Sequence, residues 1–109
     1  MKVRYLIAMA AALSISATAF AIDEDDGGEE LFKKHNCTTC HSIDKKIAGP
    51  ALKDIAAKYR GDKEAQARLE KKVRSGGSGV WGKMPMPPAP KTVKDEHIKT
   101  IIQWVLSLK

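Results

Sequence analysis

Apolar residues recur at helical spacing in several stretches of the chain, and this spacing predicts its elements. The first predicted helix covers residues 29–36, with Leu31, Phe32 and His35 on one side. A second helix is predicted to begin at Pro50, because proline suits the first turn of a helix. Its apolar positions follow the i, i+3, i+4, i+7 rule and are Leu52, Ile55, Ala56 and Tyr59.

Two further helices are predicted in the second half of the chain. Asp62 is expected to cap the third helix, which stops at the glycine-rich segment 75–79. Its apolar positions are Ala65, Leu69 and Val73. The fourth helix is expected to start at the capping pattern of residues 92–95, Thr-Val-Lys-Asp. Its apolar stripe consists of Ile98, Ile101, Ile102, Val105 and Leu106.

A proline-rich loop separates the third and fourth predicted helices. Residues 80–90 hold four of the five prolines of the chain, so this segment cannot form regular structure. No alternating pattern of useful length indicates a strand. The sequence therefore predicts an all-α, single-domain fold of about four helices without a significant sheet.

The first 21 residues have the pattern of a cleaved export signal. Lys2 and Arg4 precede an apolar run over residues 5–21, which ends in Ala-Phe-Ala, a small-x-small cleavage pattern. Two serines and a threonine interrupt the run, whereas a membrane-spanning helix needs about 20 apolar residues. We expect a signal peptide at 1–21, an acidic tip at 22–28 and one domain at 29–109. An uncleaved anchor is the alternative.

Composition narrows the class of protein. The chain has 109 residues, of which only 6% are aromatic, so its core would be marginal without a non-protein group. This size disfavours a large enzyme, a repeat protein and a multi-pass membrane protein. Residues 31–109 carry 17 basic against 7 acidic side chains. This excess is either a solvated surface or a docking face for acidic partners, whereas nucleic-acid binding is not expected.

Cys37, Cys40 and His41 form the string C-x-x-C-H, which is the attachment signature of c-type haem. Two cysteines three positions apart on a helical turn can both bond to one edge of the ring. The next residue then lies under the iron, where His41 can supply the proximal imidazole. Covalent attachment also consumes two thiols that an oxidising compartment would otherwise leave unexplained.

Two other interpretations of the motif are weaker. A disulfide or dithiol redox pair would be expected in a βαβ context, and no strands are predicted. A zinc site needs two more ligands, and His35 and His97 are expected to be surface residues without a pairing partner. His35 lies close to the motif and could replace a methionine ligand only if the loop opened.

Met84 and Met86 are candidates for the sixth iron ligand, because both lie among prolines that order the loop in advance. A His/Met pair raises the reduction potential and fills all six positions of the iron. One-electron transfer then remains as the chemistry. An enzyme or gas sensor with an open haem position is the alternative, and it requires that the methionine be absent from the iron.

The chain resembles the small bacterial class I cytochromes c of the c-551/c-552 type over nearly all of residues 29–109. The matching strings are Leu31-Phe32-Lys33, Cys37 to His41, Gly49-Pro50-Ala51 with Lys53-Asp54, Gly79-Val80-Trp81-Gly82, Pro85-Met86-Pro87-Pro88 and Trp104-Val105-Leu106. The resemblance implies one covalent haem c, a periplasmic location and a monomeric electron carrier that is not an enzyme. It also implies redox partners: a quinol-oxidising complex or another cytochrome, and a terminal oxidase or a nitrite or peroxide reductase.

The resemblance also implies roles for residues around the haem. Met86 rather than Met84 matches the family's axial ligand. Pro50 matches the proline whose carbonyl accepts the second ring proton of His41. Ala89 departs from the family, which often has Asn at this position.

Further roles concern the haem propionates and the packing of the helices. Trp81 matches a tryptophan that donates to a propionate, with a place in the core as the alternative. Lys72 matches a basic propionate partner, with Arg74 as a rival, and either could be a simple surface charge. Phe32 matches the aromatic residue that joins the first and last helices. A rim of lysines is expected to guide docking at the exposed haem edge: Lys45, Lys46 and Lys83.

Overall fold

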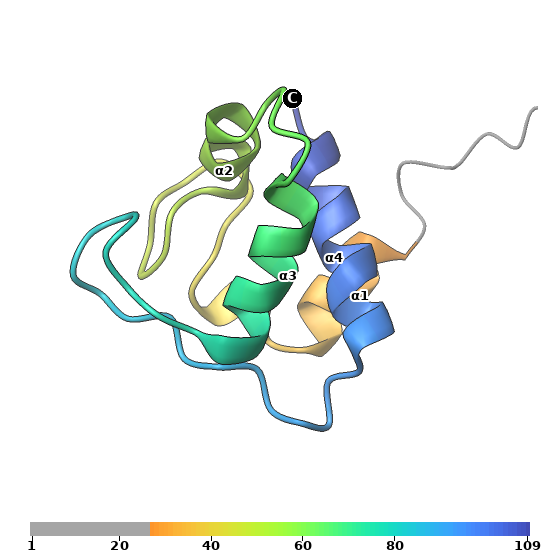
Figure 1. The fold of residues 1–109 in the computed structure, drawn as a ribbon. Coiled ribbons are helices and arrows are strands. Elements are labelled where there is room, and N and C mark those ends of the chain that lie inside the picture. Colours follow the sequence, from red (N-terminus) through yellow and green to blue (C-terminus); the bar gives the residue numbers. More distant parts are fainter. Residues whose placement is uncertain (1–26) are drawn as a thin grey trace, which may run out of the picture.

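The computed structural model describes residues 27–109, so the predicted signal peptide and most of the acidic tip lie outside the described residues. The elements are α1 (Gly28–Lys34), the short 3-10 helix η1 (Cys37–Thr39), α2 (Leu52–Lys58), α3 (Ala65–Ser75) and α4 (Asp95–Ser107) (Figure 1). Over residues 27–109 the only extended pairing is a single bridge between Gly77 and Met86. The predicted all-α fold is confirmed.

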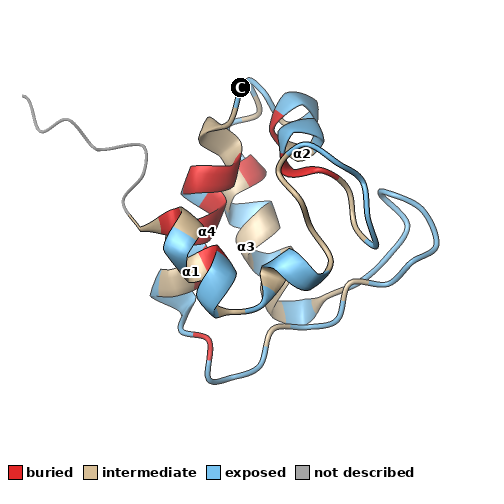
Figure 2. Ribbon diagram, turned by 180° about the vertical axis from the view of Figure 1, so that it is seen from behind, coloured by how far each residue is buried: buried red, intermediate tan, exposed pale blue. Residues whose placement is uncertain are grey.

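Helix α4 lies at the centre of the packing, in contact with α1, α2 and α3. Its stripe is apolar at helical spacing, and its buried residues are Ile98, Ile101, Ile102, Trp104 and Val105. Figure 2 shows the buried residues gathered on α4, on the adjoining side of α1 and at the start of α2. The long α3–α4 loop is mostly exposed.

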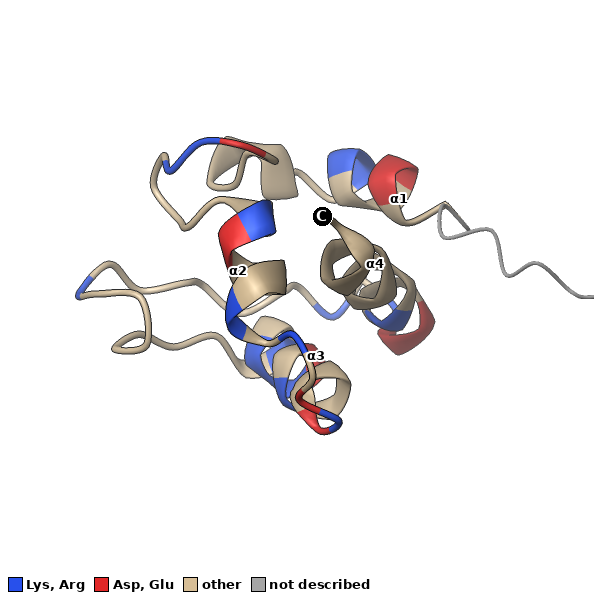
Figure 3. Cartoon of the chain, turned by 90° about the horizontal axis from the view of Figure 1, so that it is seen from above, with Lys and Arg blue, Asp and Glu red and all other residues tan. Residues whose placement is uncertain are grey.

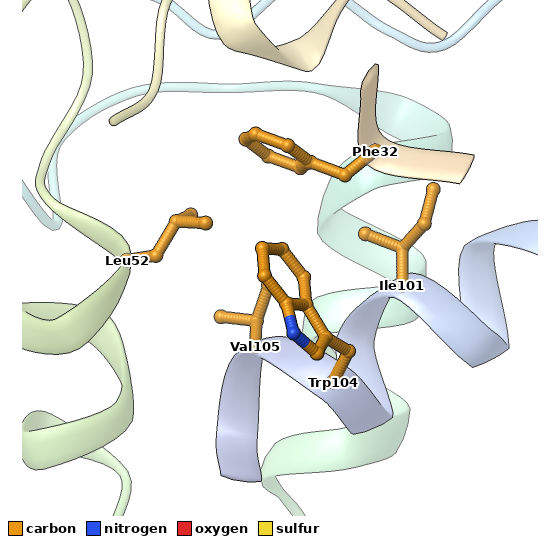
Figure 4. Packing of buried hydrophobic residues seen from close by; sticks show 5 residues of the cluster. All are labelled: Phe32, Leu52, Ile101, Trp104 and Val105. Atoms are coloured by element: carbon orange, nitrogen blue, oxygen red, sulfur yellow. The ribbon is translucent and has the colours of Figure 1, made fainter. Parts of the chain in front are cut away.

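Phe32 of α1 packs on Trp104 of α4, with ring centroids 5.4 Å apart and planes tilted by 54° (Figure 4). Leu52, Ile101 and Val105 complete this cluster. Gly28 allows the close approach of the two helices, because a Cβ at this position would collide with the Cβ of Trp104. Phe32 thus joins the first and last helices, as the resemblance implied.

A second cluster joins α3 to α4. Val93, Ile98 and Ile102 are buried, and half-buried Leu69, Val73, Ala89 and Leu106 pack against them. The backbone N–H of Ala89 donates to the carbonyl of Val73 at 2.9 Å. Ala89 therefore packs the proline-rich loop against α3 at the position where the family often has Asn.

Three predicted helix starts are displaced. Helix α2 begins at Leu52, with the extended Ala51 as its N-cap, so Pro50 precedes the helix. Helix α3 begins at Ala65, and Asp62 instead accepts a hydrogen bond from the Glu64 N–H at 2.9 Å in the preceding turn.

The expected cap of the last helix is also wrong. Helix α4 begins at Asp95 after an extended Lys94, and no side chain caps it. Thr92 lies in the turn before, where the Val93 N–H donates to the Pro90 carbonyl at 2.9 Å. Val93 in this turn is buried in the second cluster. The described elements include no helix of the length and apolarity needed to span a membrane.

Candidate haem-binding site

The segment that carries both cysteines forms a tight turn after α1. Asn36 has a left-handed backbone (φ 61°), which ends the helix two residues before the predicted end of 36. The amide of Cys40 donates to the carbonyl of Cys37 at 3.2 Å, and the amide of His41 donates to the same carbonyl at 2.9 Å. Side chains three positions apart eclipse one another in a 3-10 turn, so this geometry favours both thiols on one side.

His41 is oriented by the segment that follows it. Its Nδ1 lies 2.8 Å from the carbonyl oxygen of Pro50. Because a carbonyl only accepts, Nδ1–H is the donor, and the lone pair of a neutral ring is on Nε2. The expected hydrogen bond is therefore present, and it sets the tautomer that a ligating imidazole needs.

Gly49 supports this orientation, a role that its place in the string Gly49-Pro50-Ala51 did not predict. A Cβ at Gly49 would lie 2.6 Å from Cε1 and 2.9 Å from Nδ1 of His41. Its N–H also donates to the carbonyl of Cys40 at 2.6 Å. The glycine next to Pro50 in the sequence was the available signal, because a missing side chain allows a close approach.

Met86 is anchored by its backbone. Its N–H donates to the carbonyl of Gly77 at 2.8 Å, and its carbonyl accepts from the Gly77 N–H at 2.9 Å. Gly76, with φ 69°, lies against the Met86 carbonyl, where a side chain would not fit. Met86 is half-buried, whereas Met84 is 68% exposed. These contacts favour Met86 over Met84 as the fixed thioether.

Large apolar side chains are exposed on the two loops that also hold His41 and Met86. They are Ile47, Val80, Trp81 and Met84. Trp81 is 39% exposed, and the centroid of its ring lies 5.5 Å from Nζ of Lys58, so the interpretation of Trp81 as a core residue is wrong.

Lys72 and Arg74, near the end of α3, contact different parts of the chain. Helix α3 is rich in basic side chains (Figure 3). Arg74 donates to Oδ1 of Asp95 at 2.6 Å and to the carbonyls of Val93 at 2.6 Å and Pro90 at 3.2 Å. It therefore ties the α3–α4 loop to α3. A Cβ built on Gly77 would lie 2.8 Å from Nζ of Lys72, so this ammonium lies beside the Met86 bridge. The arrangement favours Lys72 over Arg74 as the propionate partner.

The environment of the thiols argues against a redox dithiol. Burial raises the pKa of the Cys37 thiol, and the neighbouring Cys40 adds to this effect. Reactive C-x-x-C pairs instead have a lowered thiol pKa. Over residues 27–109, no three side chains of the His, Cys, Asp or Glu type gather as a metal site, so the zinc alternative is not supported.

His35 and His97 are not separate surface residues as expected. Nε2 of His35 lies 3.0 Å from Nδ1 of His97, and both side chains are half-buried. Burial, followed by the charges of His97 and Lys34, lowers the pKa of His35. Because His97 lies four residues before the buried Ile101, the helical spacing places it on the packed side of α4, but it does not identify His35 as its partner.

The comparisons with known proteins agree with this geometry. Residues 26–109 match the family model described as cytochrome c. The chain is 43% identical to cytochrome c-551 of Pseudomonas aeruginosa, over 91% of this chain and 96% of the relative. It is also 43% identical to cytochrome c-552 of Nitrosomonas europaea over the full length of both.

Solved structures give the same result. The crystal structure of Nitrosomonas europaea cytochrome c552 matches with a TM-score of 0.71 at 48% identity, over 74% of this chain and 99% of that one. A class 1 cytochrome from Sideroxydans lithotrophicus matches with a TM-score of 0.62 at 31% identity, over 74% of this chain and 91% of that one.

The residues present fit a covalently held haem. The 3-10 turn supplies two thiols, the Pro50 hydrogen bond orients an imidazole, and the Gly77 bridge fixes the backbone of a methionine. Exposed apolar side chains on the same loops offer a surface for a large planar ring. The chain therefore belongs to the cytochrome c family, carries one covalently attached haem c and is a monohaem electron carrier.

Proposed function

We propose that this chain is a soluble periplasmic carrier that shuttles single electrons between respiratory redox proteins, with His41 and Met86 as the axial ligands. When bound, the haem supplies a one-electron Fe(II)/Fe(III) couple. The single observation that carries the proposal is the His41–Pro50 hydrogen bond, because it presents Nε2 with its lone pair to a metal.

The other residues of the site have distinct roles in this proposal. Cys37 and Cys40 would anchor the ring through two thioether bonds. Met86, whose backbone is held by the bridge to Gly77, would supply the second iron ligand and leave no open position for a substrate or a gas. Trp81 and Lys72 would donate to the propionates, and Lys72 would neutralise part of their charge.

A pair of methionine variants tests the ligand set. Met86→Ala should abolish the near-infrared sulfur-to-iron charge-transfer band of the oxidised holoprotein and allow rapid carbon monoxide binding to the reduced form. Met84→Ala is the matched control and should leave both properties unchanged. A wild-type protein that lacks the band and binds carbon monoxide rapidly would instead be an enzyme or a sensor.

Export and maturation have a separate test. We propose that residues 1–21 are a cleaved signal, 22–28 an acidic tip and 29–109 the haem domain. Intact mass of protein from the periplasmic fraction should equal residues 22–109 plus one haem. A mass that includes residues 1–21 would identify an uncleaved anchor.

Docking is proposed at the exposed haem edge, guided by three exposed lysines: Lys45, Lys46 and Lys83. The partners would be an electron donor such as a quinol-oxidising complex and an acceptor such as a terminal oxidase or a nitrite or peroxide reductase. A monomeric carrier with a small, charged contact binds and leaves rapidly. Raising the salt concentration should slow electron transfer, and a salt-independent rate would exclude guidance by these lysines.

A further inference from the structure

A pair of histidine side chains lies in contact outside the haem site. His35 is the residue that directly follows α1, and its N–H donates to the carbonyl of Leu31 at 2.9 Å. His97 lies in the first turn of α4. Nε2 of His35 and Nδ1 of His97 are 3.0 Å apart, and the ring centroids are 5.3 Å apart with planes tilted by 39°.

The packing of α1 on α4 holds the two rings together. The contact between Phe32 and Trp104 and the close approach at Gly28 fix the two helices to each other. Both histidines are half-buried, so their rotamers are restricted. A ligand that binds both rings would therefore meet a pair that is already ordered, which favours affinity.

The two nitrogens are joined by a hydrogen bond, and a metal ion that binds both would replace the proton they share. If their spacing is kept, it favours one coordination geometry. With metal–nitrogen bonds of about 2.0–2.1 Å, nitrogens 3.0 Å apart subtend roughly 90–97° at the metal. This angle matches neighbouring positions of a square-planar or tetragonal site, whereas a tetrahedral ion would need roughly 3.3–3.4 Å between them. Tetragonal nitrogen and oxygen sites are typical of Cu²⁺, which also has the highest affinity in the divalent series.

We propose that His35 and His97 form a bidentate Cu²⁺ site between α1 and α4, with water molecules in the remaining positions. Both rings bind in the neutral form, through Nε2 of His35 and Nδ1 of His97. One ring exchanges its proton to the other nitrogen through solvent, so the rings release no net proton. Burial favours the neutral form of His35, because it lowers the pKa of this side chain.

The test uses untagged, mature, oxidised holoprotein, titrated with Cu²⁺ by calorimetry and by electron paramagnetic resonance. We expect one equivalent to bind, with superhyperfine splitting from two nitrogens, and the thermal midpoint to rise because the metal joins two helices. His35→Gln and His97→Gln should each weaken binding by at least ~tenfold, because a single imidazole loses the effective concentration of the second.

The double variant H35Q/H97Q is the control for other copper ligands, because it keeps the same N-terminus and acidic residues. Its haem absorption spectrum should match that of the wild type, which shows that the fold is intact. Equal copper affinity in the double variant, or a one-nitrogen spectrum in the wild type, would overturn the proposal. Neither His41 nor Met86 takes part, so the result is independent of the proposed haem ligands.

Discussion

Substitution of Gly49 by Ala tests how the chain positions His41. The backbone of Gly49 is not in the left-handed region, so alanine adds a steric change without backbone strain. The new Cβ would lie 2.6 Å from Cε1 of His41, whereas carbon atoms normally approach to about 3.5–4.0 Å. The ring must therefore move by about 1 Å, and its hydrogen bond to Pro50 lengthens.

The expected cost has two parts. Overpacking of a close contact costs about 1–3 kcal/mol, and loss of a hydrogen bond costs about 0.5–1.5 kcal/mol. A total of about 2–4 kcal/mol lowers the thermal midpoint of a domain of this size by roughly 10–25 °C. A weaker hydrogen bond also makes the imidazole a poorer electron donor, which raises the reduction potential by roughly 20–60 mV.

Thermal denaturation and a spectroelectrochemical titration of the holoprotein measure the two effects. Gly28→Ala is the matched control, because its Cβ would collide with Trp104 at the α1–α4 contact, away from His41. This control should lower the thermal midpoint and leave the potential unchanged. An unchanged potential in Gly49→Ala, or an equal shift in Gly28→Ala, would refute the positioning role of Gly49.

Three further variants test the packing of Trp104 in the core, the titration of His35 and the attachment of the α3–α4 loop by Arg74. Trp104→Ala should lower the free energy of guanidinium unfolding by about 3–5 kcal/mol, because it leaves a cavity in the first cluster. Gln103→Ala, at an exposed position of the same helix, should lower it by almost nothing. Equal losses in the two variants would contradict the role given to burial. The thermal midpoint should fall as the pH drops below 6.5, the ordinary pKa of histidine, because the pKa of His35 is lowered in the folded state and the unfolded chain therefore binds more protons. His35→Gln should reduce this pH-dependent fall of the midpoint. An equal fall in the variant would assign the pH dependence to other groups. Arg74→Ala should cost about 1–2 kcal/mol through its carbonyl hydrogen bonds, since the exposed pair with Asp95 adds little. Guanidinium unfolding measures this loss, and an unchanged free energy of unfolding would show that Arg74 does not hold the α3–α4 loop in place.

The fold could be predicted where the signal is local and repeated. The apolar stripe of α4 and the glycines after Ser75 set a helix and its end correctly. The starts of α2 and α4 were missed, because Pro50 and Thr92 were interpreted from local cap chemistry alone. Their positions depend on the hydrogen bond to His41 and on the burial of Val93, and both contacts are tertiary.

In the candidate site, too, residues close together in the sequence could be predicted, whereas contacts between distant residues could not. Cys37, Cys40 and His41 are neighbours in the sequence, so their spacing already carries the attachment chemistry. The pairing of His35 with His97 joins residues 62 positions apart, and no local pattern reports such a contact. The loop contacts of Arg74 likewise appear only once α3 and α4 are packed.

The central place of α4 has a consequence for the order in which the chain is made. Synthesis proceeds from the N-terminus, so α4 leaves the ribosome after α1, α2 and α3. Until then Phe32 and Leu52 have no Trp104 to cover them, and α1, α2 and α3 lack the helix on which each packs. A nascent chain therefore stays open until α4 is made, with the segment Cys37–His41 accessible up to that point.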